Sequence, residues 1–325
     1  MSDTRTAGMF NFARRFDPAV ATAFVCLFVL LLVGSLYSSN FLSLEYLVQQ
    51  LKVASFLGVA ASGMMLTILL GQIDLSLPWT LTVGAMMSCA MASFGLGGEI
   101  FAVPFGVLCG VAIGVANGFG VAYLRIPAMI VTLATNSVAQ GCMVLYSGGY
   151  SPRDFASPAV RYLATGFAIP GLPNAVICWA VIGAATIFLL KRTTFGRAIY
   201  GIGNRERVAY LSGVNTRRVV LAVFAVSGGT AAFAGVLLAG YASKAAQSMG
   251  DAYLLPAIAA VVLGGTSILG GRGSYLGTVA GVMLITLLQS ILSVMQIPEY
   301  GRQIVYGVVI IGMLLLYGRG PRTRA

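Results

Sequence analysis

The sequence predicts an all-α membrane protein that crosses the bilayer many times. Hydrophobic residues make up 58% of the 325 residues and charged residues only 9%, and the mean hydropathy is +0.91. This composition is typical of helical membrane proteins and does not fit a soluble domain. The apolar runs are also unbroken, whereas strands of a membrane β-barrel would alternate apolar and polar residues over roughly ten positions.

The apolar runs predict about ten transmembrane helices. A hydrocarbon core roughly 30 Å thick needs about 20 apolar residues per helical crossing. We expect one crossing in each of ten stretches: residues 18–37, 48–70, 78–94, 100–124, 127–146, 173–190, 219–241, 254–269, 275–295 and 302–317.

The basic residues predict the orientation of these helices. Ten crossings put both termini on one side of the membrane. Of the 20 Lys and Arg residues, 15 fall on the side of the termini and the other five on the opposite side. Because Lys and Arg are enriched in cytoplasmic loops, we expect both termini in the cytoplasm.

Charge and composition also exclude several functions. The net charge of +11 is explained by basic helix ends that meet anionic lipid, so we expect no nucleic-acid partner. The chain has no histidine and no clustered carboxylates, which leaves no basis for a metal site or a nucleophilic triad. The glycine-rich run 264–273 lacks the lysine of a GxxxxGK[ST] phosphate loop. We therefore expect no catalytic residue and no cofactor, and any ATP must be bound by another subunit.

Glycines recur at small-xxx-small spacing inside the expected helices, at Gly110, Gly114 and Gly118 and again at Gly277 and Gly281. In lipid, small residues let two helix backbones approach closely. The spacing predicts helix packing within the chain, and a seam between two copies is the alternative.

Polar residues inside the membrane are costly, so each is a candidate for a solute pathway. Thr132, Thr135 and Asn136 are spaced three and four apart, which places them on one helical face, and Gln140 follows. Such a strip suits a neutral hydroxylated solute, although hydrogen bonding between helices would explain it equally well. Weaker members of the same set are Asn117, Ser227, Thr266 and Gln289.

Two aspartates occupy similar positions in the chain. Asp74 follows Gly71 and precedes Pro78, and Asp251 follows Gly250 at the start of the eighth expected helix. Five crossings separate them, which is compatible with two inverted halves of five helices each. We expect helix capping from both aspartates, with contact to a solute or ion as the alternative, and Asp74 and Ser76 are kept as pathway candidates.

The segment 191–218 carries seven basic side chains against one acidic side chain, Glu206. It contains a short amphipathic stretch between glycines, which is the kind of element that a groove of a partner protein can bind. We therefore expect a cytoplasmic docking site here.

Five motifs together resemble the ribose-type permease subunits of bacterial ABC importers. They are GQIDLS at 71–76, TLAT at 132–135, TTFGRAIYGIGN at 193–204, LSGV at 211–214 and AIAAVVLGGTS at 257–267. The resemblance runs from about residue 45 to the C-terminus. Relatives carry ribose, xylose, arabinose, galactose and related sugars.

The resemblance implies a type II importer-like permease of the bacterial inner membrane, with a single permease domain over residues 1–325. It implies cytoplasmic segments at 1–17, 191–218 and 318–325. The implied partners are a second permease subunit, most simply an identical copy, a cytoplasmic ABC ATPase and a periplasmic sugar-binding protein. In this reading an FGR turn and a helical stretch at 206–211 couple the permease to the ATPase, through Phe195, Gly196, Arg197, Gly203, Asn204, Glu206, Leu211 and Gly213.

Two other classes of function stay open on the sequence. A secondary transporter driven by an ion gradient would need titratable groups in the membrane for proton coupling, and few are present. A scaffolding subunit without a pathway would not need the polar strip at 132–140. Neighbouring genes for an ATPase and a secreted sugar-binding protein would favour the importer.

Overall fold

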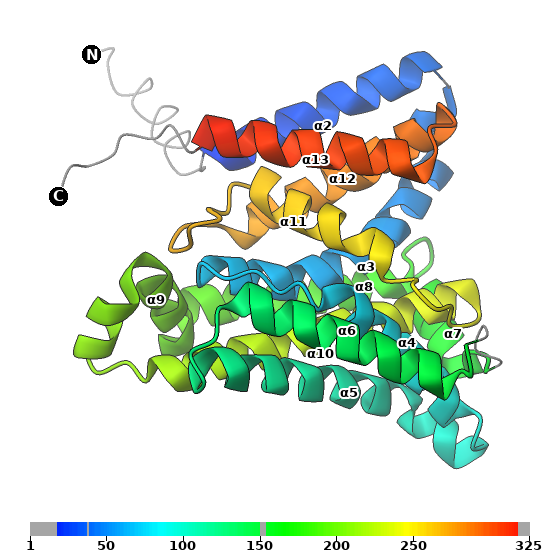
Figure 1. The fold of residues 1–325 in the computed structure, drawn as a ribbon. Coiled ribbons are helices and arrows are strands. Elements are labelled where there is room, and N and C mark those ends of the chain that lie inside the picture. Colours follow the sequence, from blue (N-terminus) through cyan, green and yellow to red (C-terminus); the bar gives the residue numbers. More distant parts are fainter. Residues whose placement is uncertain (1–17, 38, 150–153, 318–325) are drawn as a thin grey trace, which may run out of the picture.

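The computed structural model describes residues 18–37, 39–149 and 154–317, and over these residues it contains helices and no strands (Figure 1). The expected cytoplasmic segments 1–17 and 318–325 lie outside this part. The α-helices are α2 (Pro18–Tyr37), α3 (Leu44–Leu69), α4 (Leu77–Ala92), α5 (Leu96–Ala122), α6 (Ala128–Tyr146), α7 (Pro158–Thr165), α8 (Asn174–Arg192), α9 (Thr194–Leu211), α10 (Thr216–Ala242), α11 (Leu254–Leu263), α12 (Tyr275–Val294) and α13 (Glu299–Tyr317). Two short 3₁₀ helices, η1 (Ser39–Leu42) and η2 (Asp251–Tyr253), complete the described elements.

Each of the ten expected stretches contains one helix, and α7 and α9 lie outside them. By length and hydropathy, six described helices qualify as membrane-spanning: α3, α5, α6, α8, α10 and α12. The helices α4 and α11 are apolar but shorter. The chain is therefore a multi-pass helical membrane protein.

The prediction of a helix over residues 254–269 is wrong in its second half. Helix α11 ends at Leu263, and a loop over residues 264–274 follows. Gly264 packs directly on the backbone of Gly277 in α12, and Gly265 has a φ of +85°. The chain leaves the helix here because glycine permits both the close approach and the left-handed backbone.

The glycine spacing serves packing within this chain, as predicted. Helix α10 makes its most extensive contacts with α5, and both cross α4. At Gly110, Gly114 and Gly118 an added Cβ would overlap or crowd the backbone of α10, and a Cβ at Gly228 would overlap α5 in turn. The two backbones therefore touch without intervening side chains. Gly281 of α12 packs on the α11 backbone in the same way.

The helices α2, α11, α12 and α13 form a second layer beside this bundle (Figure 1). Side-chain hydrogen bonds join the layers: Tyr46 and Gln50 of α3 each lie 2.7 Å from the Ser290 hydroxyl of α12. Buried Ser62 and Trp179 both contact the Tyr275 hydroxyl, at 2.8 and 3.1 Å.

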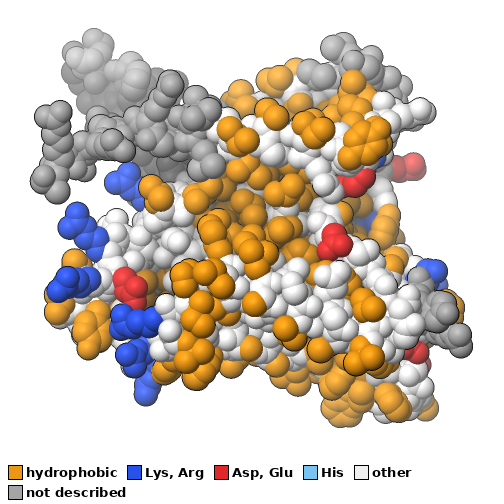
Figure 2. Space-filling view, viewed as in Figure 1, with side chains coloured by type: hydrophobic (Ala, Val, Ile, Leu, Met, Phe, Trp, Pro, Cys, Tyr) orange, Lys and Arg blue, Asp and Glu red, His pale blue; other side chains and the backbone are white. Residues whose placement is uncertain are grey.

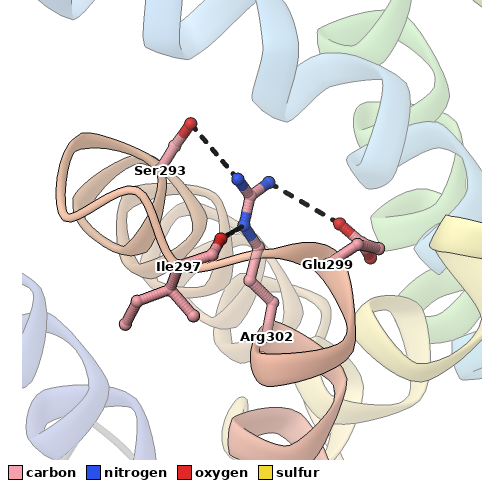
Figure 3. Close-up of polar contacts among 4 residues, drawn as sticks. All are labelled: Ser293, Ile297, Glu299 and Arg302. Atoms are coloured by element: carbon pink, nitrogen blue, oxygen red, sulfur yellow. Dashed lines mark hydrogen bonds and ion pairs between the residues drawn. The ribbon is translucent and has the colours of Figure 1, made fainter.

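Arg302 fixes the turn between α12 and α13 (Figure 3). Its Nε donates to the Ile297 carbonyl at 3.0 Å, Nη2 lies 3.4 Å from the Ser293 hydroxyl, and Nη1 lies 3.6 Å from the Glu299 carboxylate. One side chain thus holds the last turn of α12 against the first turn of α13.

Charge is distributed as a membrane protein requires. Lys and Arg side chains gather at the end of the molecule formed by α9, and a broad surface with many apolar side chains lies between this end and the other (Figure 2). Helix α13 ends on the same side as α9 (Figure 1). The apolar band matches the surface that the hydrocarbon of a bilayer would contact.

Candidate functional site

A buried polar network lies at the connection between α3 and α4. The Asp74 side chain is 1% exposed. Its Oδ1 accepts hydrogen bonds from the Ser76 backbone N–H at 3.0 Å and the Ser76 hydroxyl at 2.6 Å. Its Oδ2 accepts from the Ser227 hydroxyl of α10 at 2.9 Å. Three donors stabilise a carboxylate that has no basic partner within the described residues.

The network reaches a third helix through Asn117 of α5, whose Nδ2 donates to the Ser76 hydroxyl at 2.8 Å. Thr80 of α4 donates to the same hydroxyl at 3.3 Å. Asn117 is fully buried, and its Oδ1 has no hydrogen-bond partner in the described part of the chain. The sequence placed Asp74, Ser76, Asn117 and Ser227 in one candidate set, and the structure brings all four together.

The prediction that the two aspartates cap helices is wrong. The N-cap of α4 is Ser76, without a side-chain capping bond, and Asp74 uses its carboxylate to join α10 instead. Asp251 lies in η2, whose N-cap is Gly250, and α11 begins after Tyr253. Neither α4 nor α11 has a side-chain capping bond.

The polar strip on α6 divides between two environments. Thr132 is buried, Thr135 and Asn136 are half-buried, and Gln140 is exposed on this chain. The hydroxyls of Thr132 and Thr135 donate to carbonyls one turn earlier in their own helix, at 2.8 and 2.9 Å. Asn136 Oδ1 accepts from the Trp79 backbone N–H of α4 at 3.3 Å. The amide of Gln140 is thus the group of this strip that faces outward from the chain.

Thr266 and Gln289 lie in other parts of the fold. Thr266 belongs to the loop over residues 264–274; it is buried, and its hydroxyl has no partner among the described residues. A Cβ added to Gly273 would lie 2.6 Å from that hydroxyl, so the loop is folded tightly on itself. Gln289 is half-buried on α12.

The expected docking segment forms helix α9, which consists of two parts. Thr193 caps it by accepting from the Gly196 N–H at 3.1 Å. The residues Phe195, Gly196 and Arg197 therefore lie in the first turn of a helix, and the expected FGR turn is wrong. The backbone of Arg205 is not helical (φ −157°, ψ 102°), so the expected short helix at 206–211 is separated from the first part by a kink.

The first part of α9 is clamped between two backbones. A Cβ on Gly203 would overlap the Leu69 carbonyl at the end of α3 and would lie 2.6 Å from the Gly271 nitrogen. That nitrogen donates to the same Leu69 carbonyl at 2.9 Å. Asn204 packs on Gly271, and Tyr200 donates to the Gly273 carbonyl at 2.9 Å. Motion of this part of α9 must therefore move the end of α3, five residues before Asp74.

The second part of α9 projects apolar side chains outward. Val208, Tyr210 and Leu211 are 54%, 67% and 76% exposed, whereas Ala209 on the same short helix is buried. Glu206 is exposed beside them. Gly213, with a φ of +85°, then turns the chain into α10. An exposed apolar patch among charged residues is typical of a surface that binds a partner.

An all-helical membrane fold with a buried polar network and a surface helix clamped to the end of α3 is compatible with a transport permease. The profile of the family described as "Branched-chain amino acid transport system / permease component" matches residues 46–314, so the chain belongs to that family. The permease of an ABC importer is not an enzyme, since the ATPase of the importer is a separate subunit.

Curated relatives match along most of their length. The chain is 33% identical over 297 residues to the ribose import permease protein RbsC of Haemophilus influenzae, covering 90% of this chain and 91% of that protein. It is 32% identical over 295 residues to RbsC of Escherichia coli K12, with the same coverage. It is 33% identical over 299 residues to the autoinducer 2 import system permease protein LsrC of Salmonella typhi, covering 91% of this chain and 84% of that protein.

Proposed function

We propose that this chain is the transmembrane subunit of an ATP-driven ABC importer for a monosaccharide or a related polyol. The clamp at Gly203 carries the proposal, because it joins an exposed partner-binding helix to the backbone that leads into the buried network. The relatives add the solute class: two are named for ribose import and one for import of autoinducer 2.

In this proposal the helix at 206–211 binds in a cleft of the ATPase through Val208, Tyr210 and Leu211. Closure of the two ATPase subunits on ATP would displace the first part of α9 as a rigid lever. Because Gly203 leaves no free space, the displacement would pass to Leu69 and to the loop that carries Asp74. The permease would thus open alternately to the two sides of the membrane.

We also propose the finer topology expected from the sequence: ten crossings, two inverted halves of five helices, and both termini in the cytoplasm. The concentration of basic side chains at the α9 end supports this orientation. The domain assignment follows from it, with residues 1–325 as one permease domain and 191–218 as its cytoplasmic coupling segment.

The proposed assembly contains a second permease subunit, most simply an identical copy, a cytoplasmic ATPase and a periplasmic sugar-binding protein. Gln140 supports a pathway shared by two subunits, because its amide faces outward from α6. Thr132, Thr135, Asn136, Asn117, Asp74, Ser76 and Thr266 remain the other proposed pathway residues, acting directly or by holding the helices that line it.

Reconstitution tests the proposal. The permease would be placed in liposomes with its cognate ATPase and sugar-binding protein, and uptake of labelled ribose, related sugars and polyols would be measured. We expect uptake that requires both ATP and the binding protein. Uptake by the permease alone would contradict the proposal.

A gradient-driven transporter is the rival with a specific observation in its favour, namely the buried carboxylate of Asp74. A sodium or proton gradient imposed on liposomes without ATP separates the two functions. Uptake under a gradient that disappears in Asp74→Asn would favour the rival.

A further inference from the structure

A basic pocket lies between the α5–α6 turn and the start of α10, on the face that we propose to be cytoplasmic. It has a volume of about 770 Å³, and its lining includes Arg125, Arg207, Arg217 and Glu206. A smaller adjoining pocket of about 230 Å³ shares Arg125, Glu206 and Arg217 and extends inward to Gln72. The two pockets therefore form one continuous depression.

The charge of this pocket is not neutralised within the chain. Three arginines against one glutamate leave a net charge of +2 (3 − 1) on the lining. Within the described residues, no carboxylate lies within 4.0 Å of any of the three arginines. Three guanidinium groups around one depression repel each other and attract an anion, and phosphate and carboxylate are the anions whose oxygens match the guanidinium fork.

Two of these arginines lie close to the end of α5. The guanidinium carbon of Arg217 lies 5.8 Å from the centre of the Tyr123 ring, so the ring supports its side chain from below. Arg125 has a φ of +57°, a backbone conformation that is uncommon for residues other than glycine. Arg217 thus holds positive charge over Tyr123 at the end of α5, and Arg125 follows three residues after that helix.

An apolar stripe leads along α5 to this end of the helix. Leu108, Val115, Phe119 and Tyr123 are 62%, 38%, 48% and 42% exposed. Their spacings of seven, four and four residues put them on one face of the helix, and Phe119 stacks on Tyr123 with ring centres 5.3 Å apart. A ligand in the pocket would thus have an apolar surface directly beside it, on the side facing the membrane interior.

We propose that this pocket binds the phosphate of an anionic phospholipid of the cytoplasmic leaflet, with an acyl chain along the α5 stripe. A free phosphate ion would also satisfy the arginines, but only a lipid adds an acyl chain that can lie along the stripe. Since Arg207 belongs to α9 and Arg125 to the α5–α6 turn, one bound headgroup bridges the coupling segment and the transmembrane bundle. The lipid would hold the second part of α9 in place for the ATPase.

Native mass spectrometry of the full-length chain in mixed micelles tests the site. We expect retention of phosphatidylglycerol over phosphatidylcholine with the same acyl chains. Each basic residue near an anionic lipid surface is worth about fivefold in affinity, so Arg125→Gln/Arg217→Gln should weaken phosphatidylglycerol binding roughly thirtyfold. Arg272→Gln removes an exposed arginine of the loop 264–274, outside the pocket, and should leave binding unchanged.

Four results would overturn the proposal. Equal retention of both lipids would remove the charge recognition, and equal retention by the wild type and the double variant would remove the site. Displacement of the lipid by millimolar inorganic phosphate would assign the pocket to a soluble anion. If the substitutions weaken binding of the ATPase and leave lipid retention intact, the occupant is an acidic segment of the ATPase. Should the double variant fail to fold, Arg125→Gln and Arg207→Gln are tested singly against the same predictions.

Discussion

Adding one methyl group at Gly203 should break the link between α9 and the rest of the permease. In Gly203→Ala the new Cβ would overlap the Leu69 carbonyl oxygen and lie 2.6 Å from the Gly271 nitrogen, and both are backbone atoms that cannot rotate away. An ordinary contact is about 3.5 Å, so relieving the overlap with the Leu69 oxygen requires a shift of the helix by roughly 1.5 Å or more.

The expected cost follows from these contacts. Overpacking of this kind destabilises a protein by about 1–3 kcal/mol. The shift would also strain the hydrogen bond from Gly271 to Leu69, which contributes about 1 kcal/mol. The displaced first part of α9 would no longer push on the end of α3. We therefore expect ATP hydrolysis by the assembled importer to continue while sugar uptake falls by tenfold or more.

Gly201→Ala is the matched control, two residues earlier on the same helix. A Cβ added at Gly201 would lie 3.9 Å from the Ala209 side chain, which is the atom nearest to it, so no clash arises. Alanine is the better helix former, and the variant should be more stable by roughly 0.5–1 kcal/mol. Uptake, ATP hydrolysis and thermal unfolding are measured for both variants. Equal uptake and equal melting temperatures in the two would refute the clamp.

Three more perturbations test other parts of the molecule. Asp74→Asn should lower stability by about 1–3 kcal/mol in thermal unfolding, because it removes a charged acceptor from three donors; an unchanged melting temperature would show that the network contributes little. Gly235→Ala should lower stability by about 1–3 kcal/mol, since its Cβ would overlap the Leu81 carbonyl, whereas Gly141→Ala, with nothing within 4 Å, should be tolerated, and the melting temperatures of the two variants distinguish them. Leu211→Ser should weaken co-purification of the ATPase at unchanged melting temperature, because the side chain is 76% exposed; undiminished co-purification would move the docking surface elsewhere.

The sequence predicts the positions of helices wherever hydropathy alone determines them. All ten apolar stretches contain a helix, because a long apolar run has few other stable forms in lipid. The small-residue spacing on α5 likewise predicted packing within the chain, which the contacts with α10 confirm. Hydropathy does not predict the end of α11. The loop that follows α11 depends on the close approach of Gly264 to Gly277, and a one-dimensional hydropathy pattern does not contain that contact.

The polar network could be predicted in its membership but not in its connections. On the sequence, Asp74, Ser76, Asn117 and Ser227 are all candidates for the solute pathway. The bond from Ser227 to Asp74 joins residues 153 positions apart, and no local pattern encodes such a pairing. For the same reason the sequence predicts a helix cap at Asp74, because capping is the role that its position next to a helix start favours.

The backbone contact between α5 and α10 limits how this permease can move. Where one main chain lies directly on another, no rotamer change can accommodate sliding, and these two helices must travel as a single body. The contacts of α3 with α12 through Tyr46, Gln50 and Ser290 are different, because hydroxyl and amide groups can exchange partners at small cost. Any rearrangement during a transport cycle should therefore concentrate at that seam, and spin labels placed across it should report larger distance changes than labels across the glycine contact.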